Sequence, residues 1–423
     1  MRKLKCLLFL YFCLASCSDK KVASDFPIID VIGSIGNYKK VYCSDLFSSV
    51  ELIPLETSDE CLLDVPILSL SGVIMNDDII LVRYTYFGNF FLCTFDHTGK
   101  YLNRIGQKGQ GPGDFQLIST IAFNKENRSI YVWNGSMNIL EYGYNGKLIR
   151  SISIPKVEGE IFDEHAYTGN GLFVGHLSYT GKNKYSYCIY DRNGGIVTCF
   201  PNHIFFDRPR AGWSSFDQAL ELTRVNEQLY LKDYLNDTVF CLVNSTIQPA
   251  FVFDMGNYSY PQKYLESSDG QAVIEKAILT RFLLGTPKYF FYEILVPENL
   301  PTPKINPVYR QMANKYITRE SLVYGIYNID ENTNILLDIN KNMLEEKGII
   351  NDLNGGLPFF PRYYAGDNLL VDMWDAEKMK RMLTEEYFEK QTIKDQQAHQ
   401  KLRELLKNLQ EDDNPVVVIA KLK

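Results

Sequence analysis

The chain has 423 residues, of which 45% are hydrophobic and 13% aromatic, so it is long enough to bury a large core. Its formal net charge of −7 gives no support to nucleic-acid binding, which needs a concentrated basic face. Length alone favours two or three domains, but a single closed ring of sheet repeats can use a chain of this size.

The first 17 residues have the pattern of a signal peptide. A basic start at residues 2–5 precedes an apolar run, residues 6–14, that is too short to cross a bilayer as a helix. The run ends in Leu14-Ala15-Ser16-Cys17, which resembles a bacterial lipoprotein cleavage box. This resemblance implies cleavage before Cys17, lipid attachment to Cys17 and anchoring in a membrane. The alternative is an ordinary secretory signal in which the cysteine stands by chance.

The chain after this signal divides into two parts. We expect residues 18–49 to form a polar tether with short β-type segments at 27–31 and 38–46, and residues 50–423 to form the folded domain. Because Ser18 follows Cys17, where an aspartate would favour retention in the inner membrane, we predict a cell-envelope protein of the outer membrane. The sequence leaves the membrane leaflet open.

One type of hairpin recurs along the folded domain. Each copy has a strand, a turn that contains glycine, and a second strand, which is a strong local hairpin signal. The turn glycines Gly99, Gly146 and Gly194 are 47 and 48 positions apart. A fixed period of this length, with about four short strands per unit, is typical of propeller blades.

We predict six blades, at 66–105, 118–154, 162–200, 219–253, 289–339 and 357–422. A helical pattern lies within 260–284, a long inserted loop is predicted over 297–320, and a charged helix over 376–410 interrupts the last blade. Since an open ring would leave an unpaired strand edge, we expect a strand at 50–55 to join the last blade beside the C-terminal strands. The predicted fold class is all-β, a six-bladed β-propeller with a C-terminal helical insertion in the last blade.

Four stretches carry a resemblance to a known family: Ile53 to Thr57, the loop from Gly106 to Phe115, Asp237 to Phe240, and Asp413 to Pro415. With them the chain resembles the six-bladed β-propeller lipoproteins of Bacteroidetes, which are distantly similar to NHL-repeat propellers. The resemblance covers nearly the whole mature chain. It implies an extracytoplasmic propeller, but it carries over no activity and no catalytic residue.

Local motifs for catalysis are weak in this sequence. The loop 106–113 is glycine-rich but matches no nucleotide-binding pattern and lies between strands, so we interpret it as a crossing between blades. None of the five histidines has metal-ligand spacing. His97 and His399 are expected to be solvated, whereas His176 ends an inner strand and could face the central channel. We predict no catalytic residue, no metal and no cofactor, and leave open a site dispersed over several blades.

The cysteines after Cys17 form no Cys-x-x-Cys pair, which argues against a zinc ribbon or a thioredoxin-type motif. Cys93 and Cys241 lie in predicted strands, where a free cysteine behaves as a small apolar residue. Cys188 and Cys199 flank one hairpin turn, and the sequence leaves open whether they form a disulfide.

A candidate ligand site follows from the strand map, because propellers bind ligands at the mouth of the central channel. The residues predicted there are Arg83, Tyr84, Trp133, His176, Arg208, Arg210, Trp213, Asp233, Tyr234 and Trp374. Arginine and aromatic side chains suit a sugar or a peptide, through bidentate hydrogen bonds and stacking. The competing interpretation is that half of these side chains pack between blades.

The first functional hypothesis is a lipid-anchored binding or scaffold module for a glycan, a peptide or an envelope protein. The alternative is a metal-dependent hydrolase or lyase with its site in the channel, which a lining of carboxylates and histidines would favour. A third hypothesis is a structural partner of an outer-membrane uptake complex, with the charged helix 376–410 as the contact.

Overall fold

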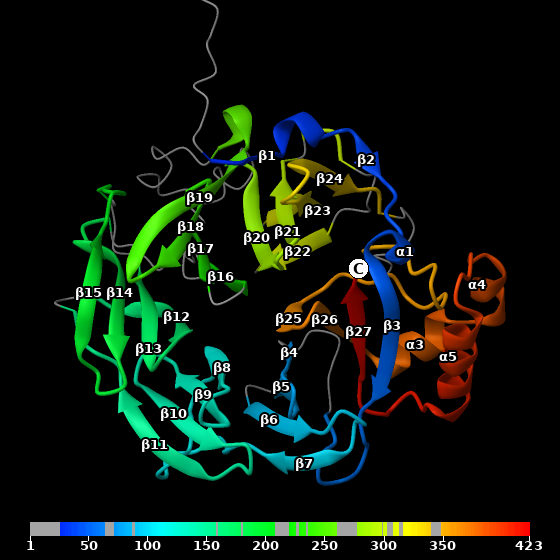
Figure 1. Cartoon of the computed structure of the whole chain (residues 1–423), viewed down its shortest axis with the longest axis horizontal. Helices are drawn as coiled ribbons and strands as arrows, with labels where there is room; N and C mark the ends of the chain where they lie inside the picture. The colour runs from blue at the N-terminus through cyan, green and yellow to red at the C-terminus, as the bar shows by residue number, and fades with distance from the viewer. Residues whose placement is uncertain are drawn as a thin grey trace, which may run out of the picture.

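Six β-sheets surround a central axis in the computed structural model of the chain (Figure 1). The structure describes residues 26–63, 72–86, 89–157, 160–178, 181–207, 220–225, 228–233, 236–259, 277–297, 299–302, 308–312, 316–339 and 348–423. Cys17 and the predicted signal peptide lie outside these residues, as do Arg208, Arg210, Trp213 and Tyr234. No helix in the described ranges is long and apolar enough to cross a membrane.

Blades 1 to 3 are antiparallel sheets of four strands, with strands given from the axis outwards. Blade 1 contains β4 (Gly72–Met75), β5 (Ile80–Tyr86), β6 (Asn89–Phe95) and β7 (Tyr101–Arg104). Blade 2 contains β8 (Thr120–Asn124), β9 (Ser129–Asn134), β10 (Asn138–Gly143) and β11 (Leu148–Ser153). Blade 3 contains β12 (Phe162–Gly169), β13 (Leu172–Leu177), β14 (Tyr185–Asp191) and β15 (Ile196–Pro201).

Blades 4 to 6 include strands from the N-terminal segment. Blade 4 contains β16 (Leu220–Val225), β17 (Gln228–Asp233), β18 (Thr238–Val243), β19 (Thr246–Asp254) and β1 (Ile28–Asp30). Blade 5 contains β20 (Leu279–Gly285), β21 (Tyr289–Val296), β23 (Tyr316–Asn328), β24 (Thr333–Leu337) and β2 (Tyr38–Lys39). Blade 6 contains β25 (Tyr363–Gly366), β26 (Leu369–Trp374), β27 (Val416–Leu422) and β3 (Phe47–Pro54).

The N-terminal segment runs along the outer rim of three consecutive blades. β1 pairs in parallel with β19, β2 pairs in parallel with β24, and β3 pairs antiparallel with β27. Two short helices, η1 (Ile32–Ser34) and α1 (Cys43–Leu46), connect these strands, so the predicted strand at 38–46 is wrong over its second half. β3 closes the ring beside the C-terminal strand, which confirms the predicted closure.

The turn glycines explain why the blade period is so regular. Gly99, Gly146 and Gly194 have φ values of 86°, 77° and 77°, which glycine adopts without a steric penalty. A Cβ on Gly146 would lie 2.5 Å from the carbonyl oxygen of Arg104, in the preceding blade. The corresponding carbonyl oxygens are those of Pro54 for Gly99 and Ser153 for Gly194. Each turn therefore fits directly against the outer strand of the blade before it.

The hydrophobic core lies between neighbouring blades. In β9, Ile130 and Val132 pack with residues of blade 1, whereas Tyr131 and Trp133 pack with residues of blade 3. This alternation follows from the two-residue period of a strand, which sends successive side chains to opposite faces of the sheet. A residue in a second or third strand is therefore more often core than channel lining.

Two of the predicted segments differ from the structure in blade 5. Residues 279–285 form β20, so the last part of the predicted helical stretch 260–284 is a strand, and residues 260–276 lie outside the described part of the chain. Within the predicted loop 297–320, β22 (Val308–Met312) pairs with the start of β23 as a hairpin. A further short helix, η2 (Gly256–Tyr258), precedes this blade.

The segment between β26 and β27 contains three helices where one was predicted. They are α3 (Ala376–Met382), α4 (Glu385–Glu389) and α5 (Gln396–Asn408). The breaks have a local cause, because Thr384 and Asp395 are N-caps whose side chains accept hydrogen bonds from the backbone of Tyr387 and Ala398. α5 packs against β3 and covers that side of blade 6.

Candidate functional site

The two ends of the ring differ in the length of their connections. The connections between blades, and those between the second and third strand of each blade, lie at one end, which we call the long-loop face. The turns between the first and second strands and between the third and fourth strands lie at the other end, which we call the short-turn face. The glycine-rich loop 106–113 connects β7 to β8 on the long-loop face, which confirms its interpretation as a crossing between blades.

Ionisable side chains from blades 1 and 3 meet at the long-loop end of the channel, and we call them the throat cluster: Arg83, Asp163, Glu164 and His176. His176 Nδ1 lies 2.7 Å from Asp163 Oδ1, and the His176 side chain is fully buried. Arg83 donates a hydrogen bond to the Ser119 carbonyl oxygen at 3.2 Å, which holds blade 1 to the entry of blade 2. The cluster thus joins three blades at one mouth.

Glu164 has the most perturbed carboxyl of the throat cluster. The pKa of Glu164 is raised from its usual value to about 7, mainly by burial and secondly by the nearby Asp163 carboxylate. His176, Arg83 and a hydrogen bond with Thr120 oppose this shift. The Arg83 pKa is lowered by its own burial and partly restored by Glu164. Near neutral pH Glu164 can therefore gain or lose a proton.

A second charged group comes from blades 5 and 6. The Arg362 guanidinium lies 2.5 Å from Glu293 Oε1 and stacks over the rings of Phe282 and Phe360 at 5.2 and 5.8 Å. Burial raises the pKa of Asp372 to about 6, while Arg362 lowers it. The end of the channel therefore combines acids and bases that are largely paired with one another.

The sequence-predicted site residues divide between this mouth and the core. Arg83 and His176 belong to the throat cluster. Tyr84 is 3% exposed and stacks on Phe91, Trp133 is fully buried between blades 2 and 3, and Trp374 is 4% exposed in the core near α3. Their registers direct these rings between blades, so we remove them from the candidate site. The Asp233 side chain, Arg208, Arg210, Trp213 and Tyr234 lie outside what the structure describes.

Two histidines predicted to be solvated have different environments. His97 is exposed in its turn, in agreement with the prediction. His399 is half-buried, because its Nδ1 donates a hydrogen bond to the Asn354 carbonyl oxygen at 2.8 Å and its ring packs edge-on against Phe388. That prediction was wrong, since the helix α5 packs against a loop that the sequence did not place.

The sequence interpretation missed most of the charged residues at the mouth. These are Asp163, Glu164, Glu293, Arg362 and Asp372. A usable signal was present, because Glu293 and Asp372 each interrupt an otherwise apolar or aromatic strand, in Tyr289–Val296 and Leu369–Trp374. A charge within such a run must find water or a partner, and Arg362 is the partner that faces both carboxylates.

Exposed apolar side chains lie in the connections of the long-loop face from blade 1 to the end of blade 3. Five such residues lie in its connections: Leu62 (47% exposed), Leu117 (46%), Met137 (51%), Ile161 (64%) and Phe205 (54%). Among the described residues, no large hydrophobic side chain with this degree of exposure lies in the turns of the short-turn face. Exposed apolar side chains also begin the outer strands next to those turns, at Leu102, Leu148, Ile149, Ile196 and Val197, so the long-loop face differs in carrying such side chains on the connections themselves.

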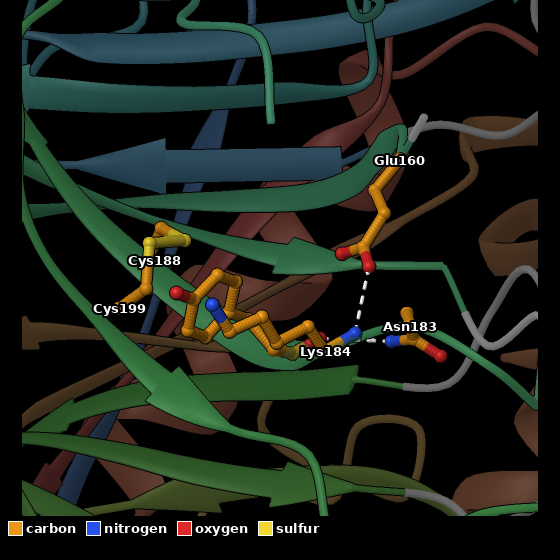
Figure 2. Close-up of a disulfide and its surroundings, with 6 residues drawn as sticks. Glu160, Asn183, Lys184, Cys188 and Cys199 are labelled. Atoms are coloured by element: carbon orange, nitrogen blue, oxygen red, sulfur yellow. Dashed lines mark hydrogen bonds between the residues drawn. A yellow bond between two sulfur atoms is a disulfide. The ribbon is translucent and has the colours of Figure 1, made fainter. Parts of the chain in front are cut away.

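Blade 3 stabilises its part of this apolar rim in two ways. Glu160 Oε1 accepts a hydrogen bond from the backbone N–H of Lys184 at 2.8 Å, and Asn183 Nδ2 donates to the Tyr185 carbonyl oxygen at 2.8 Å (Figure 2). A disulfide between Cys188 and Cys199 links β14 to β15, which answers the question that the sequence left open (Figure 2). The Glu160 bond thus holds the loop next to Ile161 to the start of β14, and the disulfide joins the two outer strands of the same blade.

The ionisable side chains at the mouth bear on whether it could hold a metal ion. No three His, Cys, Asp or Glu side chains among the described residues are arranged to hold a metal ion. In the throat cluster, Nδ1 of His176 is already engaged by Asp163.

Comparisons with known proteins support the fold. The chain is similar to the crystal structure of a "putative exported protein" of Bacteroides fragilis NCTC 9343, at 17% identity and a TM-score of 0.63, over 94% of this chain and 99% of that one. A member of the duf4221 family from Bacteroides vulgatus ATCC 8482 is more distant, at 12% identity and a TM-score of 0.45, over 69% of this chain and 85% of that one. A search of curated protein sequences gave no significant match. A family model described as a domain of unknown function, DUF4934, matches residues 26–421, and the chain therefore belongs to the DUF4934 family.

Proposed function

We propose that this protein is a binding module that holds a peptide or protein ligand at its long-loop face. The observation that carries the proposal is the presence of five exposed apolar side chains in the connections of the long-loop face, at the same end of the ring as the throat cluster. Exposed apolar side chains combined with a small number of polar groups are common at ligand and partner sites. The throat cluster would add orientation through charged hydrogen bonds.

A peptide fits this mouth better than a glycan does. Sugar recognition relies on exposed aromatic faces, and the rings of Tyr84, Trp133 and Trp374 are buried. The rim offers the aliphatic side chains of Leu62, Leu117 and Ile161, a single exposed ring among the described residues, Phe205, and Met137, which adapts its shape to apolar partners. The throat offers both acidic and basic groups, as a peptide with mixed charges or a free terminus requires.

The alternative function is a metal-dependent hydrolase or lyase. The observation in its favour is the meeting of Asp163, Glu164 and His176 in one throat, with the pKa of Glu164 raised to about 7. Such a carboxyl could act as a general acid or base near neutral pH. Elemental analysis of the purified chain tests this alternative, since a stoichiometric ion lost in a Glu164→Gln variant would favour the enzyme.

We further propose that the protein is exported to the cell envelope and anchored through lipid on Cys17. The cleavage-box pattern, the disulfide between Cys188 and Cys199, and the similarity to a "putative exported protein" support this location. Labelling of cells with a radioactive fatty acid tests the anchor. The label should appear on the wild-type chain and be lost in Cys17→Ala.

Arrays of peptides and glycans probed with the chain from Ser18 onwards test the binding proposal. A selected ligand should lose at least tenfold in affinity with Met137→Asp and Ile161→Asp combined, because both side chains would then repel an apolar contact. Glu126→Gln, in a turn of the short-turn face, is the matched control and should stay within twofold. Binding only to glycans, or equal loss in the control, would contradict the proposal.

A further inference from the structure

A cavity of about 920 Å³ lies on the outer side of blades 5 and 6, and we call it the outer cavity. Its walls come from the chain between β2 and α1, from the connection 348–358 that leads from blade 5 to blade 6, and from the helices α3 and α4 with the residues after α4. These helices lie outside the ring of blades in Figure 1. None of the four residues of the throat cluster lines the outer cavity, so it is separate from the mouth.

Hydrogen bonds between the walls fix the shape of the outer cavity. The backbone N–H of Cys43 donates to the Ile350 carbonyl oxygen at 2.7 Å, and that of Ile350 donates to the Val41 carbonyl oxygen at 2.9 Å. The Tyr387 hydroxyl of α4 donates to the Gly356 carbonyl oxygen at 3.1 Å. Both the N-terminal segment and the helices are thus bonded to the connection. The outer cavity is therefore formed before a ligand arrives, and its volume is within the range of about 300–1,000 Å³ that is usual for small-molecule sites.

The charged side chains of the outer cavity balance one another. The described lining contains three acids and three bases: Asp338, Asp352, Glu386, Lys40, Arg381 and Lys390. Lys390 Nζ lies 2.6 Å from Glu386 Oε1. Lys394 Nζ lies 2.9 Å from Asp352 Oδ2, and Arg381 Nε lies 3.3 Å from Glu377 Oε1. Lys40 and Asp338 directly follow the parallel pair of Lys39 and Leu337, so they lie at one edge of blade 5. A charged ligand would meet no surplus of the opposite charge here.

Neutral polar side chains complete the polar lining. These are amides and hydroxyls: Tyr42, Asn351, Thr384, Tyr387, Gln391 and Thr392. Asn351 is only 2% exposed, and its Oδ1 accepts a hydrogen bond from the backbone N–H of Asn354 at 3.3 Å. Its Nδ2 has no acceptor in the part of the chain that the structure describes. Because buried amide donors are nearly always hydrogen-bonded, this one indicates a ligand that brings an oxygen acceptor.

Apolar surface lies beside these polar groups. The half-buried side chains of Tyr42 and Tyr387 line the outer cavity together with Ile350, Pro358 and Met382. Aromatic rings and aliphatic side chains suit the C–H faces of a sugar ring. Amides and hydroxyls both donate and accept, as the hydroxyls of a sugar require.

We propose that the outer cavity binds a short neutral saccharide. The Asn351 amide donates to a hydroxyl or N-acetyl oxygen of this ligand, and the tyrosine rings pack against its C–H faces. The inference goes beyond the proposed function, because a peptide at the mouth and a saccharide in the outer cavity would share no residue.

Isothermal titration calorimetry of the chain from Ser18 onwards tests the proposal. The probes are neutral di- and trisaccharides of hexoses and N-acetylhexosamines, compared with saccharides that carry uronate or sulfate and with an acetylated, amidated tripeptide. Thr392→Trp should weaken the binding of a neutral saccharide about tenfold or more, because Thr392 is exposed and a large ring there would fill the outer cavity. Asn351→Ala should weaken it about fivefold through the loss of one donor.

The matched control is Thr333→Trp, which places the same ring on an exposed residue at the opposite end of blade 5. It should leave saccharide binding within twofold of the parent chain, and so should Met137→Asp combined with Ile161→Asp at the mouth. Equal urea midpoints would show that the variants are folded, and Thr392→Trp alone decides if Asn351→Ala is not. The proposal would be overturned if no neutral saccharide binds, if the acidic saccharides or the tripeptide bind more tightly, or if Thr392→Trp has no more effect than Thr333→Trp.

Discussion

Asn414 holds the closure of the propeller ring, and its replacement by alanine should destabilise the whole fold. Its side chain is fully buried. Oδ1 accepts a hydrogen bond from the backbone N–H of Leu63 at 2.7 Å, and Nδ2 donates to the carbonyl oxygens of Glu56 at 2.6 Å and Cys61 at 2.9 Å. Asn414 therefore joins the start of β27 to the segment that leads from β3 into blade 1.

The expected loss in the free energy of unfolding follows from these three hydrogen bonds. Asn414→Ala removes all of them and leaves one backbone N–H and two carbonyl oxygens short of a buried partner. At about 1–1.5 kcal/mol for each bond, with a larger cost for the unpaired N–H, the free energy of unfolding should fall by about 3–5 kcal/mol. This is a large share of the roughly 5–15 kcal/mol that stabilises a typical domain.

Urea unfolding of the chain from Ser18 onwards, followed by tryptophan fluorescence, measures this loss. Asn408→Ala is the control, because Asn408 is exposed and its amide donates only to the Glu404 carbonyl oxygen one helical turn away. The control should change the free energy of unfolding by less than about 0.5 kcal/mol. A loss below about 1 kcal/mol for Asn414→Ala would show that the closure does not depend on this residue.

Three further predictions concern the repeat, the disulfide and the throat. Gly146→Ala should cost about 2–4 kcal/mol, because a Cβ there meets a carbonyl oxygen at 2.5 Å, whereas Gly72→Ala, with nothing within 4 Å of its Cβ, should cost less than about 1 kcal/mol in the same urea assay. Reduction of the Cys188–Cys199 disulfide should lower the free energy of unfolding by about 2–4 kcal/mol, and equal urea midpoints with and without reductant would contradict this. Because the Glu164 pKa is raised to about 7 from 4.5, its contribution to stability is complete below pH 4.5 and is lost as the pH rises through 7. Between pH 5 and 8 the wild type should thus lose about 2 kcal/mol more than Glu164→Gln does, and parallel pH profiles would refute this.

The ring could be predicted from the sequence because its signals are local. The turns at Gly99, Gly146 and Gly194 fix the hairpins through a backbone conformation that glycine favours, and their spacing gives the blade length. Closure by 50–55 followed from the need to pair every strand edge. The two stretches 53–57 and 413–415 lie far apart in the sequence, and in the structure Asn414 joins them through hydrogen bonds to Thr57 and Glu56.

The remaining segments could not be predicted because tertiary pairing decides them. β22 is only five residues long, and it pairs with β23 as a hairpin within a stretch whose prolines favoured a loop. β1 and β2 are only three and two residues long, so they have little tendency to form strands away from β19 and β24. For the same reason the throat cluster was missed, since its members come from strands of different blades and share no spacing.

The aromatic candidates show that the direction of a side chain could not be predicted even where its strand was. Trp133 and Trp374 end strands near the long-loop face, as predicted, but the ends of strands do not determine which way a ring points. The register of β9 directs Trp133 toward blade 3, where its Nε1 donates to the Tyr190 hydroxyl at 3.3 Å. A pattern of two-residue alternation alone cannot separate a blade-facing side chain from a channel-facing one.

The long-loop face is the proposed ligand-binding face. A photo-crosslinking amino acid placed in the turn at either end of β9 tests this directly. Met137 and Glu126 lie in the turns at opposite ends of β9, and both are exposed. With benzoylphenylalanine at position 137, irradiated cells of the native host should yield a discrete protein or peptide adduct, and position 126 should yield none. Adducts from position 126 alone, or the same adducts from both positions, would contradict the account.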